Sequence, residues 1–431
     1  MLDKIRDAKR GQDHYYISFE AGVGNPVFQN ELPYDTGKFP DAGYRLLSLY
    51  RYWNIIQYYF PYKHLIEEDW KDVLAEFLQE FAGAKNDLEY KLAALQLISR
   101  VHDTHANIWG RDTTLRNYMG VRNVPVSLKF IDEKPVVTGI AEVTGEGFEA
   151  LQVGDIIVQV NSQPVTEIVK ERLKYTAASN YPTQLRIISN SLLRTNDTIL
   201  PVVFERNGRQ ERIMVHTYEA AKIHFGNPMQ RPDSLFKMIR PDIAYVYPGS
   251  IKEEYLANIR RAGMNAKGMI IDLRCYPSEF IVFSLGNYLV KDPTPFVKFT
   301  NASPEMPGTF TYTEPLEVGI EGNLDFNGKV VILVNEMTQS QAEYTAMAFR
   351  AARGATVIGS TTAGADGNVS WFNLPGGIST MISGIGVYYP DGKETQRIGI
   401  IPDIEVKPTV EGIRQGRDEV LERALEIIEK G

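Results

Sequence analysis

The sequence has little of what several common classes of protein require. Its 431 residues include one cysteine, Cys275, which excludes an internal disulfide framework and a metal site built from several cysteines. The net charge of −8, without a basic stripe interleaved with aromatic residues, argues against a nucleic-acid-binding protein. No apolar run approaches the ~20 residues of a membrane-spanning helix. We therefore expect no nucleic-acid partner and no membrane span.

The first residues, MLDKIRDAKRGQDHYY, also lack the apolar core of a secretory signal peptide. A cytoplasmic protein and a protein whose export signal has been trimmed both fit this start. Hydrophobic residues make up 43% of the chain and charged residues 23%, which are ordinary values for a soluble globular protein. At this length we expect two or three domains rather than a single core.

The most informative stretch is predicted to be a buried strand followed by a polar turn and a helix. Residues 330–334 form a continuous apolar run rich in β-branched side chains, which is typical of a strand buried on both faces. Residues 335–339 form the turn, and the helix begins at Ser340. A serine hydroxyl here could attack a carbonyl carbon, with the free N–H groups and the positive dipole end of the helix beside the oxyanion.

The same serine has a purely structural interpretation. Ser340 and Glu343 have the spacing of a capping box, in which the serine caps the helix and the glutamate reaches back to the N–H of the cap residue. These two residues alone favour capping over catalysis. The rest of the chain has to supply the catalytic partners.

The N-terminal region is predicted to be helical after an irregular segment over residues 1–40. Residues 42–59 carry apolar and aromatic side chains at near-helical spacing, and two further helical patterns cover about 69–81 and 88–101. We interpret the first stripe as core packing of a small helical domain. It consists of Leu46, Leu47, Tyr50, Trp53 and Ile56.

The last of these helices ends at a short segment with two histidines. His102 and His105 have the i, i+3 spacing of a pair of metal ligands, but the sequence suggests no third ligand, so we expect no metal site. A single histidine of this kind is more often a structural residue with a hydrogen-bond partner. Asp103 and Thr104 lie between the two histidines, so the segment reads Asp-Thr-His.

Residues 118–218 have a strand pattern in place of the helical pattern that precedes them. Strand-like pieces alternate with turns and cover 124–130, 135–140, 156–160, 199–205 and 210–215. Residues 151–165, LQVGDIIVQVNSQPV, resemble the core motif of PDZ domains, in which a Gly-Asp turn enters a strand. Such a module captures an extended peptide at a sheet edge. No Gly-Leu-Gly-Phe loop is identified, so peptide capture and a purely structural role both remain open.

Residues 219–431 alternate strands and helices after a linker at about 218–234. Strands are predicted at 243–247, 268–273, 356–358, 378–382 and 387–389, and helices at 251–262, 279–289 and 418–430. Together with the unit around Ser340, this alternation predicts a layered α/β domain.

The strand–turn–helix unit resembles a known nucleophile motif. Residues 338–343, Thr-Gln-Ser-Gln-Ala-Glu, are similar to the Thr-x-Ser-x-x-Glu of the tail-specific (C-terminal processing) and tricorn-like serine peptidases. Asp103, Thr104 and His105 resemble the Asp-Gly-His segment of the same superfamily. The resemblance implies that Ser340 is the nucleophile and His105 the general base. It also implies that Thr104 helps to orient the base, as a serine does in tricorn.

Two departures from the family concern its branch and its oxyanion hole. Residues 270–274 match the family's Asp-Leu-Arg strand end, but Cys-Tyr-Pro-Ser follows in place of Asn-x-Gly-Gly, and proline has no N–H to donate. We therefore expect one oxyanion donor from Tyr276 or a shifted amide, and the other from the backbone N–H of Gln341. Ala365 stands where tail-specific peptidases carry the lysine of a Ser/Lys dyad. The resemblance thus implies the His-type, tricorn-like branch.

The C-terminal part supplies the last candidate. Residues 399–406, GIIPDIEV, match the closing Gly-x-x-Pro-Asp-x-x-Val of the superfamily. Tricorn-like members have a glutamate shortly before this glycine that steadies the catalytic histidine. Its expected position is Gln396, so Glu394, two residues earlier, is the candidate. The structural alternative for Glu394 is an exposed acid in a turn.

The resemblance covers residues 41–410 and implies a multi-domain α+β protein. A helical domain would span 1–117, a PDZ-like domain 118–218 and a crotonase/ClpP-like α/β core 219–431. The implied activity is that of a serine endopeptidase that needs no cofactor and no metal. Its substrate would be a peptide or an unfolded protein, and it would work outside the cytoplasm, in the periplasm or the cell envelope.

Two other functions remain open from the sequence. A catalytically decayed binding protein with the same fold would hold a peptide or an apolar ligand. The missing Gly-Gly loop and lysine favour it, whereas Ser340, His105 and Asp103 argue against it. A different acyl-transfer enzyme would need a coenzyme A site, and no nucleotide-binding feature is visible. The sequence also leaves the oligomeric state open.

Overall fold

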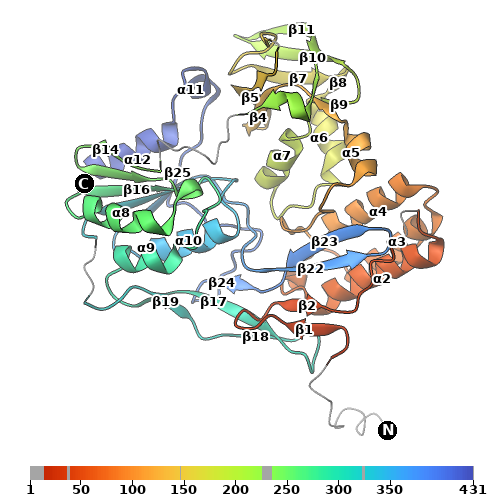
Figure 1. The fold of residues 1–431 in the computed structure, drawn as a ribbon, viewed down its shortest axis with the longest axis horizontal. Coiled ribbons are helices and arrows are strands. Elements are labelled where there is room, and N and C mark those ends of the chain that lie inside the picture. The colour runs from red at the N-terminus through yellow and green to blue at the C-terminus, as the bar shows by residue number, and fades with distance from the viewer. Residues whose placement is uncertain (1–13, 36–38, 146, 226–234, 323–325, 431) are drawn as a thin grey trace.

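Figure 1 shows three parts of the chain that meet near its centre: a helical region, a β-rich module and a sheet covered by helices. The structure is a computed structural model and describes residues 14–35, 39–145, 147–225, 235–322 and 326–430. Parts of the predicted irregular N-terminus and of the predicted linker, including residues 1–13 and 226–234, therefore lie outside the described residues.

The helical region consists mainly of three helices that begin at polar caps. They are α2 (Ala42–Tyr59), α3 (Trp70–Gly83) and α4 (Asp87–Ser99), and they agree with the predicted ones. Asp41, Asp69 and Asn86 precede them, and each of these side chains accepts a backbone N–H of the first turn. Such bonds satisfy donors that have no partner inside the helix.

The buried face of α2 differs from the predicted stripe. Tyr52 and Ile56 are fully buried, whereas Leu47 and Tyr50 are 36% and 43% exposed. Leu49, Tyr52 and Ile56 follow the helical period toward the core, so the two exposed residues lie on the other face. Because aromatic residues occur all round this helix, their spacing alone does not define which face is buried.

The β-rich module contains a sheet with strand order β11-β10-β7-β5-β4. Its strands lie close to the predicted positions: β4 (Val126–Ile131), β5 (Lys134–Ile140), β7 (Ile156–Val160), β10 (Ile199–Arg206) and β11 (Arg209–His216). In the predicted Gly-Asp turn, Gly154 has a φ of 91° and the Asp155 carboxylate accepts the N–H of Gln152 at 2.7 Å. Two helices, α6 (Val165–Leu173) and α7 (Tyr181–Ser189), complete the module, and α7 contacts the edge strand β4.

The C-terminal part is organised around a six-stranded sheet with the order β14-β15-β16-β20-β21-β25. The strands from β15 to β25 are parallel, and β14 pairs antiparallel with β15. Their bounds are β14 (Phe236–Arg240), β15 (Ile243–Val246), β16 (Gly268–Asp272), β20 (Lys329–Val334), β21 (Thr356–Gly359) and β25 (Ile404–Glu405).

Helices cover both faces of this sheet. The helices α8 (Leu256–Gly263), α9 (Val282–Leu289) and α10 (Gln341–Arg350) share one apolar core with the sheet, and α12 (Glu419–Glu429) shares a second core with the other face. Val330 and Ile332 of β20 point into the first core, and Val331 and Leu333 into the second. This arrangement explains the continuous apolar run of β20.

One hairpin in the C-terminal part of the chain lies outside the six-stranded sheet and packs on the helical region. Its strands β22 (Val369–Leu374) and β23 (Ile378–Ser383) pair antiparallel, and Phe372 and Ile382 join the core around α2. Figure 1 shows the hairpin beside α2 and α3, away from β16. The sequence placed residues 378–382 in the layered α/β domain. The structure places them outside its sheet, because the apolar face of the hairpin is covered by the helical region.

The packing of Phe372 yields a prediction about stability. Phe372 is 4% exposed and lies against the rings of Phe28 and Tyr52, whereas the preceding residue Trp371 is 51% exposed. We expect Phe372→Ala to lower the free energy of unfolding by about 3–5 kcal/mol because it leaves a cavity. Trp371→Ala should cost about 1 kcal/mol or less. Urea unfolding followed by circular dichroism measures both, and equal losses would contradict the described packing.

Candidate active site

Ser340 occupies the N-cap of α10 in a strained backbone conformation, with a φ of 56° and a ψ of −122°. The turn before it is fixed from two sides. The Thr338 hydroxyl donates to the carbonyl of Leu273 at 2.7 Å and accepts the N–H of Asn335 at 3.1 Å. The N–H of Ser340 donates to the carbonyl of Ala365 at 2.9 Å and lies 3.2 Å from the Glu343 carboxylate. Surrounding hydrogen bonds of this kind are what keep a strained residue in place.

Glu343 does more than the capping box requires. Its fully buried carboxylate accepts the Thr362 hydroxyl and the backbone N–H groups of Gly364, at 2.8 Å, and Ala365, at 3.1 Å. Burial raises the pKa of Glu343, and these donors oppose the rise. The carboxylate therefore joins the first turn of α10 to the loop at residues 362–365.

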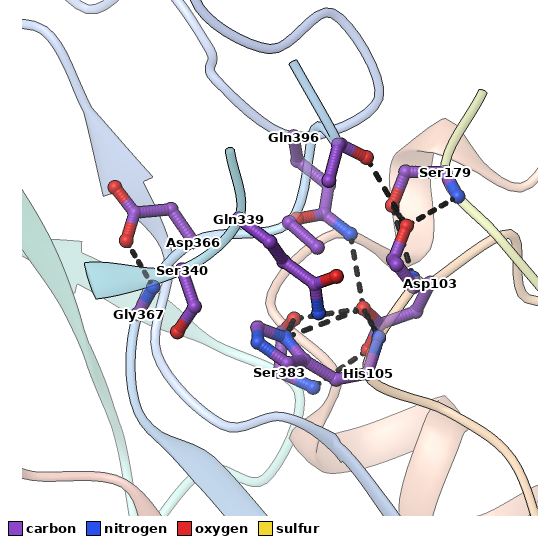
Figure 2. A network of polar contacts seen from close by, with 12 residues as sticks. Asp103, His105, Ser179, Gln339, Ser340, Asp366, Gly367, Ser383 and Gln396 are labelled. Carbon is purple, nitrogen blue, oxygen red and sulfur yellow. Dashed lines mark hydrogen bonds and ion pairs between the residues drawn. The ribbon is translucent and has the colours of Figure 1, made fainter. Parts of the chain in front are cut away.

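A second buried acid, Asp366, follows this loop. Burial and the charge of Glu343 raise the pKa of Asp366 well above its usual range, while the N–H of Gly367 donates to one of its oxygens at 2.6 Å. Figure 2 shows this carboxyl group on the side of Ser340 opposite to Asp103. The surroundings of Asp366 thus disfavour its ionised form.

The same loop reaches the segment that carries His105. Ala363 accepts the Thr104 hydroxyl through its carbonyl at 3.1 Å, and its N–H donates to the carbonyl of Thr338 at 2.9 Å. One residue therefore links the turn before Ser340 to the neighbour of His105. Thr104 also exchanges hydrogen bonds of 2.9–3.0 Å with Ser179 of the β-rich module. Its hydroxyl thus joins the three parts of the chain. That Thr104 helps to orient His105 stays a prediction.

His105 is 4% exposed and contacts a serine–carboxylate pair. Its Nδ1 lies 2.9 Å from the Ser383 hydroxyl, and that hydroxyl donates to Asp103 Oδ1 at 2.9 Å. The backbone N–H groups of His105 and Ser383 donate to the same carboxylate, at 3.1 and 2.6 Å. Figure 2 shows the imidazole between the Ser340 side chain and the Asp103 carboxylate.

The chain of donors determines which nitrogen of the ring can act as a base. An ionised carboxylate only accepts hydrogen bonds, so Ser383 donates its proton to Asp103 and accepts from Nδ1–H of His105. The other nitrogen, Nε2, then carries the free lone pair that a general base needs. Burial lowers the pKa of His105, and the charge of Asp103 offsets only part of this effect.

The structure places the predicted orienting acid elsewhere. Glu394 contacts Nε2 of His64, an exposed histidine, so the described contacts do not join it to His105. Gln396, the position at which the resemblance expected a glutamate, is 1% exposed and donates through Nε2 to Asp103 Oδ1 at 3.4 Å. The carboxylate beside His105 is therefore that of Asp103, and its nearest oxygen lies 3.7 Å from Nδ1.

The predicted oxyanion donors lie at the start of α10 and in the loop after β16. Gln341 is the first residue of the helix, where backbone N–H groups have no partner inside the helix. Its side chain donates to the carbonyl of Glu279 at 2.8 Å and so holds that loop beside the helix. Tyr276 lies in the same loop and is 44% exposed.

Within the described residues, no hydrogen bond joins Ser340 Oγ to His105 Nε2. Such bonds are often long in a protein without substrate and shorten only in the substrate complex.

The described residues also contain no group of three or more His, Cys, Asp or Glu side chains that could hold a metal ion. His102 has a φ of 53°, and burial, with a smaller effect of Arg397, lowers the pKa of its imidazole.

A cavity of about 880 Å³ lies between the β-rich module and the turn before Ser340. It is lined by β4 and α7 on one side and by Glu336 and Met337 on the other. Arg186 of α7 donates to the carbonyl of Glu336 at 2.6 Å and to the Gln339 side chain at 2.9 Å. Lys129 of β4 pairs with the Glu336 carboxylate at 3.0 Å. The module is therefore attached directly to the turn that positions Ser340.

Sequence reasoning missed three of these residues. Ser383 and Arg186 belong to no motif, and nothing in their local sequence indicates their partners, which lie 278 and 150 or more positions away. Gln396 was noted only as the place where an acid was expected. The sequence shows the order of the motifs along the chain, but this order does not reveal which residues from other segments contact them.

One family model matches the part of the chain that contains Ser340. Residues 248–406, which include Ser340, match the model of Peptidase family S41. This match supports a serine protease hydrolase. No curated protein matches the chain in sequence.

Solved structures share the fold over nearly the whole chain. Mature CPAF complexed with lactacystin has a TM-score of 0.70 at 14% identity, covering 90% of this chain and 98% of that chain. A second structure of mature CPAF has a TM-score of 0.70 at 13% identity, covering 90% and 96%. A candidate peptidase from Parabacteroides merdae has a TM-score of 0.57 at 16% identity, covering 90% and 97%. Among the described residues, no helix is both long and apolar enough to span a membrane.

The contacts of His105 predict its protonation and tautomer. Because its pKa is lowered, the His105 imidazole should be less protonated at pH 6.5 than a free histidine, which is about half protonated there. This histidine should therefore make the free energy of unfolding fall as the pH drops below about 6.5, since the unfolded chain binds the proton more readily. Nitrogen-15 chemical shifts of the ring should show the Nδ1–H tautomer, and Ser383→Ala should weaken that preference.

The variant His105→Gln shows which ring signals belong to His105. A titration in urea gives the histidine pKa of the unfolded chain as the reference. A ring that is more than half protonated at pH 6.5 would contradict the lowered pKa, and an Nε2–H tautomer that is unchanged in Ser383→Ala would contradict the assigned hydrogen bonds.

Proposed function

We propose that the protein is a serine endopeptidase that cleaves peptide bonds through an acyl-enzyme, with Ser340 as nucleophile and His105 as general base. The observation that carries this proposal is the chain of contacts from His105 Nδ1 through the Ser383 hydroxyl to the buried Asp103 carboxylate. A histidine held in this tautomer presents a basic nitrogen on the side of Ser340. The match of residues 248–406 to the model of Peptidase family S41 supports the same class of reaction.

In the first half of the reaction, Ser340 Oγ bonds to the carbonyl carbon of the peptide and its proton passes to His105 Nε2. The C–N bond then breaks, and His105 gives the proton to the leaving amine. In the second half, water attacks the ester carbon and gives a proton to His105. The bond from this carbon to Ser340 Oγ then breaks, His105 returns the proton to Oγ, and the acyl part leaves as a carboxylic acid. The N–H of Gln341 at the helix start is the proposed oxyanion donor, with the second donor from the loop that contains Tyr276.

The cavity beside β4 suits an extended peptide substrate. We infer a PDZ-like role for the β-rich module, because its edge strand β4 and its helix α7 line a cavity that also contacts the turn before Ser340. By resemblance to the peptidase superfamily, we also propose a crotonase/ClpP-like fold for the α/β core. A peptide or an unfolded protein is the proposed substrate. By resemblance to bacterial relatives, we also propose that the protein works outside the cytoplasm.

Labelling with a fluorophosphonate tests the nucleophile. We expect mass spectrometry to find the adduct on Ser340, and expect no adduct in Ser340→Ala and a strongly reduced one in His105→Ala, because the hydroxyl is a weak nucleophile without its base. Heat-unfolded wild-type protein is the control for labelling unrelated to the folded site. A folded sample that is not labelled would instead favour a binding protein with a decayed site.

Substitution of two acids distinguishes the structural assignment from the one made on the sequence. Asp103→Asn should lower kcat on unfolded casein by about 10²–10⁴-fold, since the relay would no longer fix the tautomer of His105. Glu394→Gln should change kcat by less than about 2-fold, because Glu394 contacts the exposed His64. Circular dichroism confirms that both variants fold. A larger loss in Glu394→Gln would restore Glu394 as the orienting acid.

A further inference from the structure

Two of the four tryptophans in the chain are exposed next to each other. Trp109 is 39% exposed and Trp371 is 51% exposed, and their rings form an edge-to-face pair with centroids 6.4 Å apart. The other two, Trp53 and Trp70, donate their indole N–H groups to each other's carbonyls within the helical region. Apolar surface that is exposed in one patch can mark a binding site.

The pairing of β22 with β23 shows which face of the hairpin carries Trp371. Trp371 pairs with Met381 and Val369 pairs with Ser383, so these four residues point to the same side. Phe372 and Ile382, on the other side, are buried in the helical region. Because Ser383 on the first side contacts His105, the exposed Trp371 lies on the same face of the hairpin as the proposed base.

Trp109 is hydrogen-bonded to the backbone of His105. Its indole N–H donates to the carbonyl of His105 at 3.0 Å, and its backbone N–H donates to the carbonyl of Ser379 in β23 at 2.8 Å. These two bonds hold the indole ring between the segment of His105 and the hairpin, where it contacts Trp371. The exposed pair is therefore built into the surroundings of His105.

We propose that Trp109 and Trp371 form the subsite for the substrate residue that follows the scissile bond, and that this subsite accepts a large apolar side chain, preferably an aromatic one. The inference rests on the proposed function. His105 must reach the leaving amine to protonate it, so the residue that carries this amine lies on the side of the imidazole. An aromatic side chain there gains edge-to-face contacts with the two indoles and buries apolar area that is otherwise exposed to water.

The test uses a property that only the leaving-group side has. The wild-type protein is first given a peptide library, and mass spectrometry identifies the residues on both sides of each cut. We expect enrichment of Phe, Tyr, Trp and Leu directly after the cut. One cleaved peptide is then made with either Phe or Gly at that position. The nitrophenyl ester of its acyl part, which has no residue after the reacting bond, is made as the reference substrate.

Trp371→Ala should lower kcat/KM for the Phe peptide by about 10-fold, and leave both the Gly peptide and the nitrophenyl ester within about 2-fold. Trp371→Phe should restore most of the loss. The control is Tyr255→Ala, which removes another partly exposed aromatic ring, on the α/β part of the chain. Trp371 is chosen for substitution because Trp109 also holds the backbone of His105.

The outcomes separate this inference from the proposed function. Cleavage with no preference after the cut, or an equal loss for the ester in Trp371→Ala, would overturn the subsite and leave the peptidase in place. Enrichment of Lys or Arg at that position would also overturn it, since the indoles would then bind a cation. If the wild-type protein cleaved neither peptides nor the ester, the proposed function itself would fail, and the subsite with it.

Discussion

The buried carboxylate of Asp103 is the group on which the arrangement of the site depends. A fully buried charge is costly unless several donors satisfy it. Asp103 is fully buried and accepts hydrogen bonds from His105, Ser383 and Gln396. The last two donors lie 280 and 293 positions along the chain, so the carboxylate is satisfied only when the C-terminal segments reach the helical region. For Ser383, the hairpin of β22 and β23 provides this connection, because Ser383 is the last residue of β23.

The loop at residues 362–365 has a similar role on the side of the nucleophile. Its backbone contacts Glu343, the N–H of Ser340 and the hydroxyl of Thr104, and the Asn180 side chain donates to the carbonyl of Thr362 at 2.9 Å. The helical region, the β-rich module and the α/β core therefore share one set of hydrogen bonds around Ser340. A shift of the module relative to the core would change the turn before Ser340 through Arg186. Such coupling is a consequence of building one site from three parts.

Much of the fold could be predicted because it is determined by local periodicity. The helices of the N-terminal region, the strands of the β-rich module and the buried strand β20 follow from apolar spacing and turn residues. The position of the hairpin could not be predicted in this way, since alternation gives the apolar face of a strand and not the surface that covers it. The exposed face of α2 was missed for a related reason, because aromatic residues occur on all sides of that helix.

In the candidate site, too, the residues within local motifs could be predicted and those with purely tertiary contacts could not. Ser340, His105 and Gln341 lie within motifs and could be named from the sequence. Ser383 could not, since its contact with His105 is purely tertiary. The carboxylate beside His105 is that of Asp103 and not that of Glu394. The segment before Gly399 instead places an amide, Gln396, against this carboxylate, which the Asp-Thr-His segment already supplies. A motif identifies a position, but the charge found there depends on what the facing segment contributes.

The backbone of Ser340 bears on whether this serine only caps its helix. A capping residue normally has an extended backbone, and the caps of α2, α3 and α4 have φ values of −67°, −64° and −153°. Ser340 instead has a φ of 56°, which costs a residue with a side chain of order 1–3 kcal/mol. A serine that only capped the helix could avoid this cost in the extended conformation. The hydrogen bonds from its N–H to Ala365 and Glu343 maintain the strained conformation, and two buried acids beside it add a further cost. This combination is expected where the direction of the hydroxyl matters more than the stability of the turn, which favours the catalytic interpretation over the capping one.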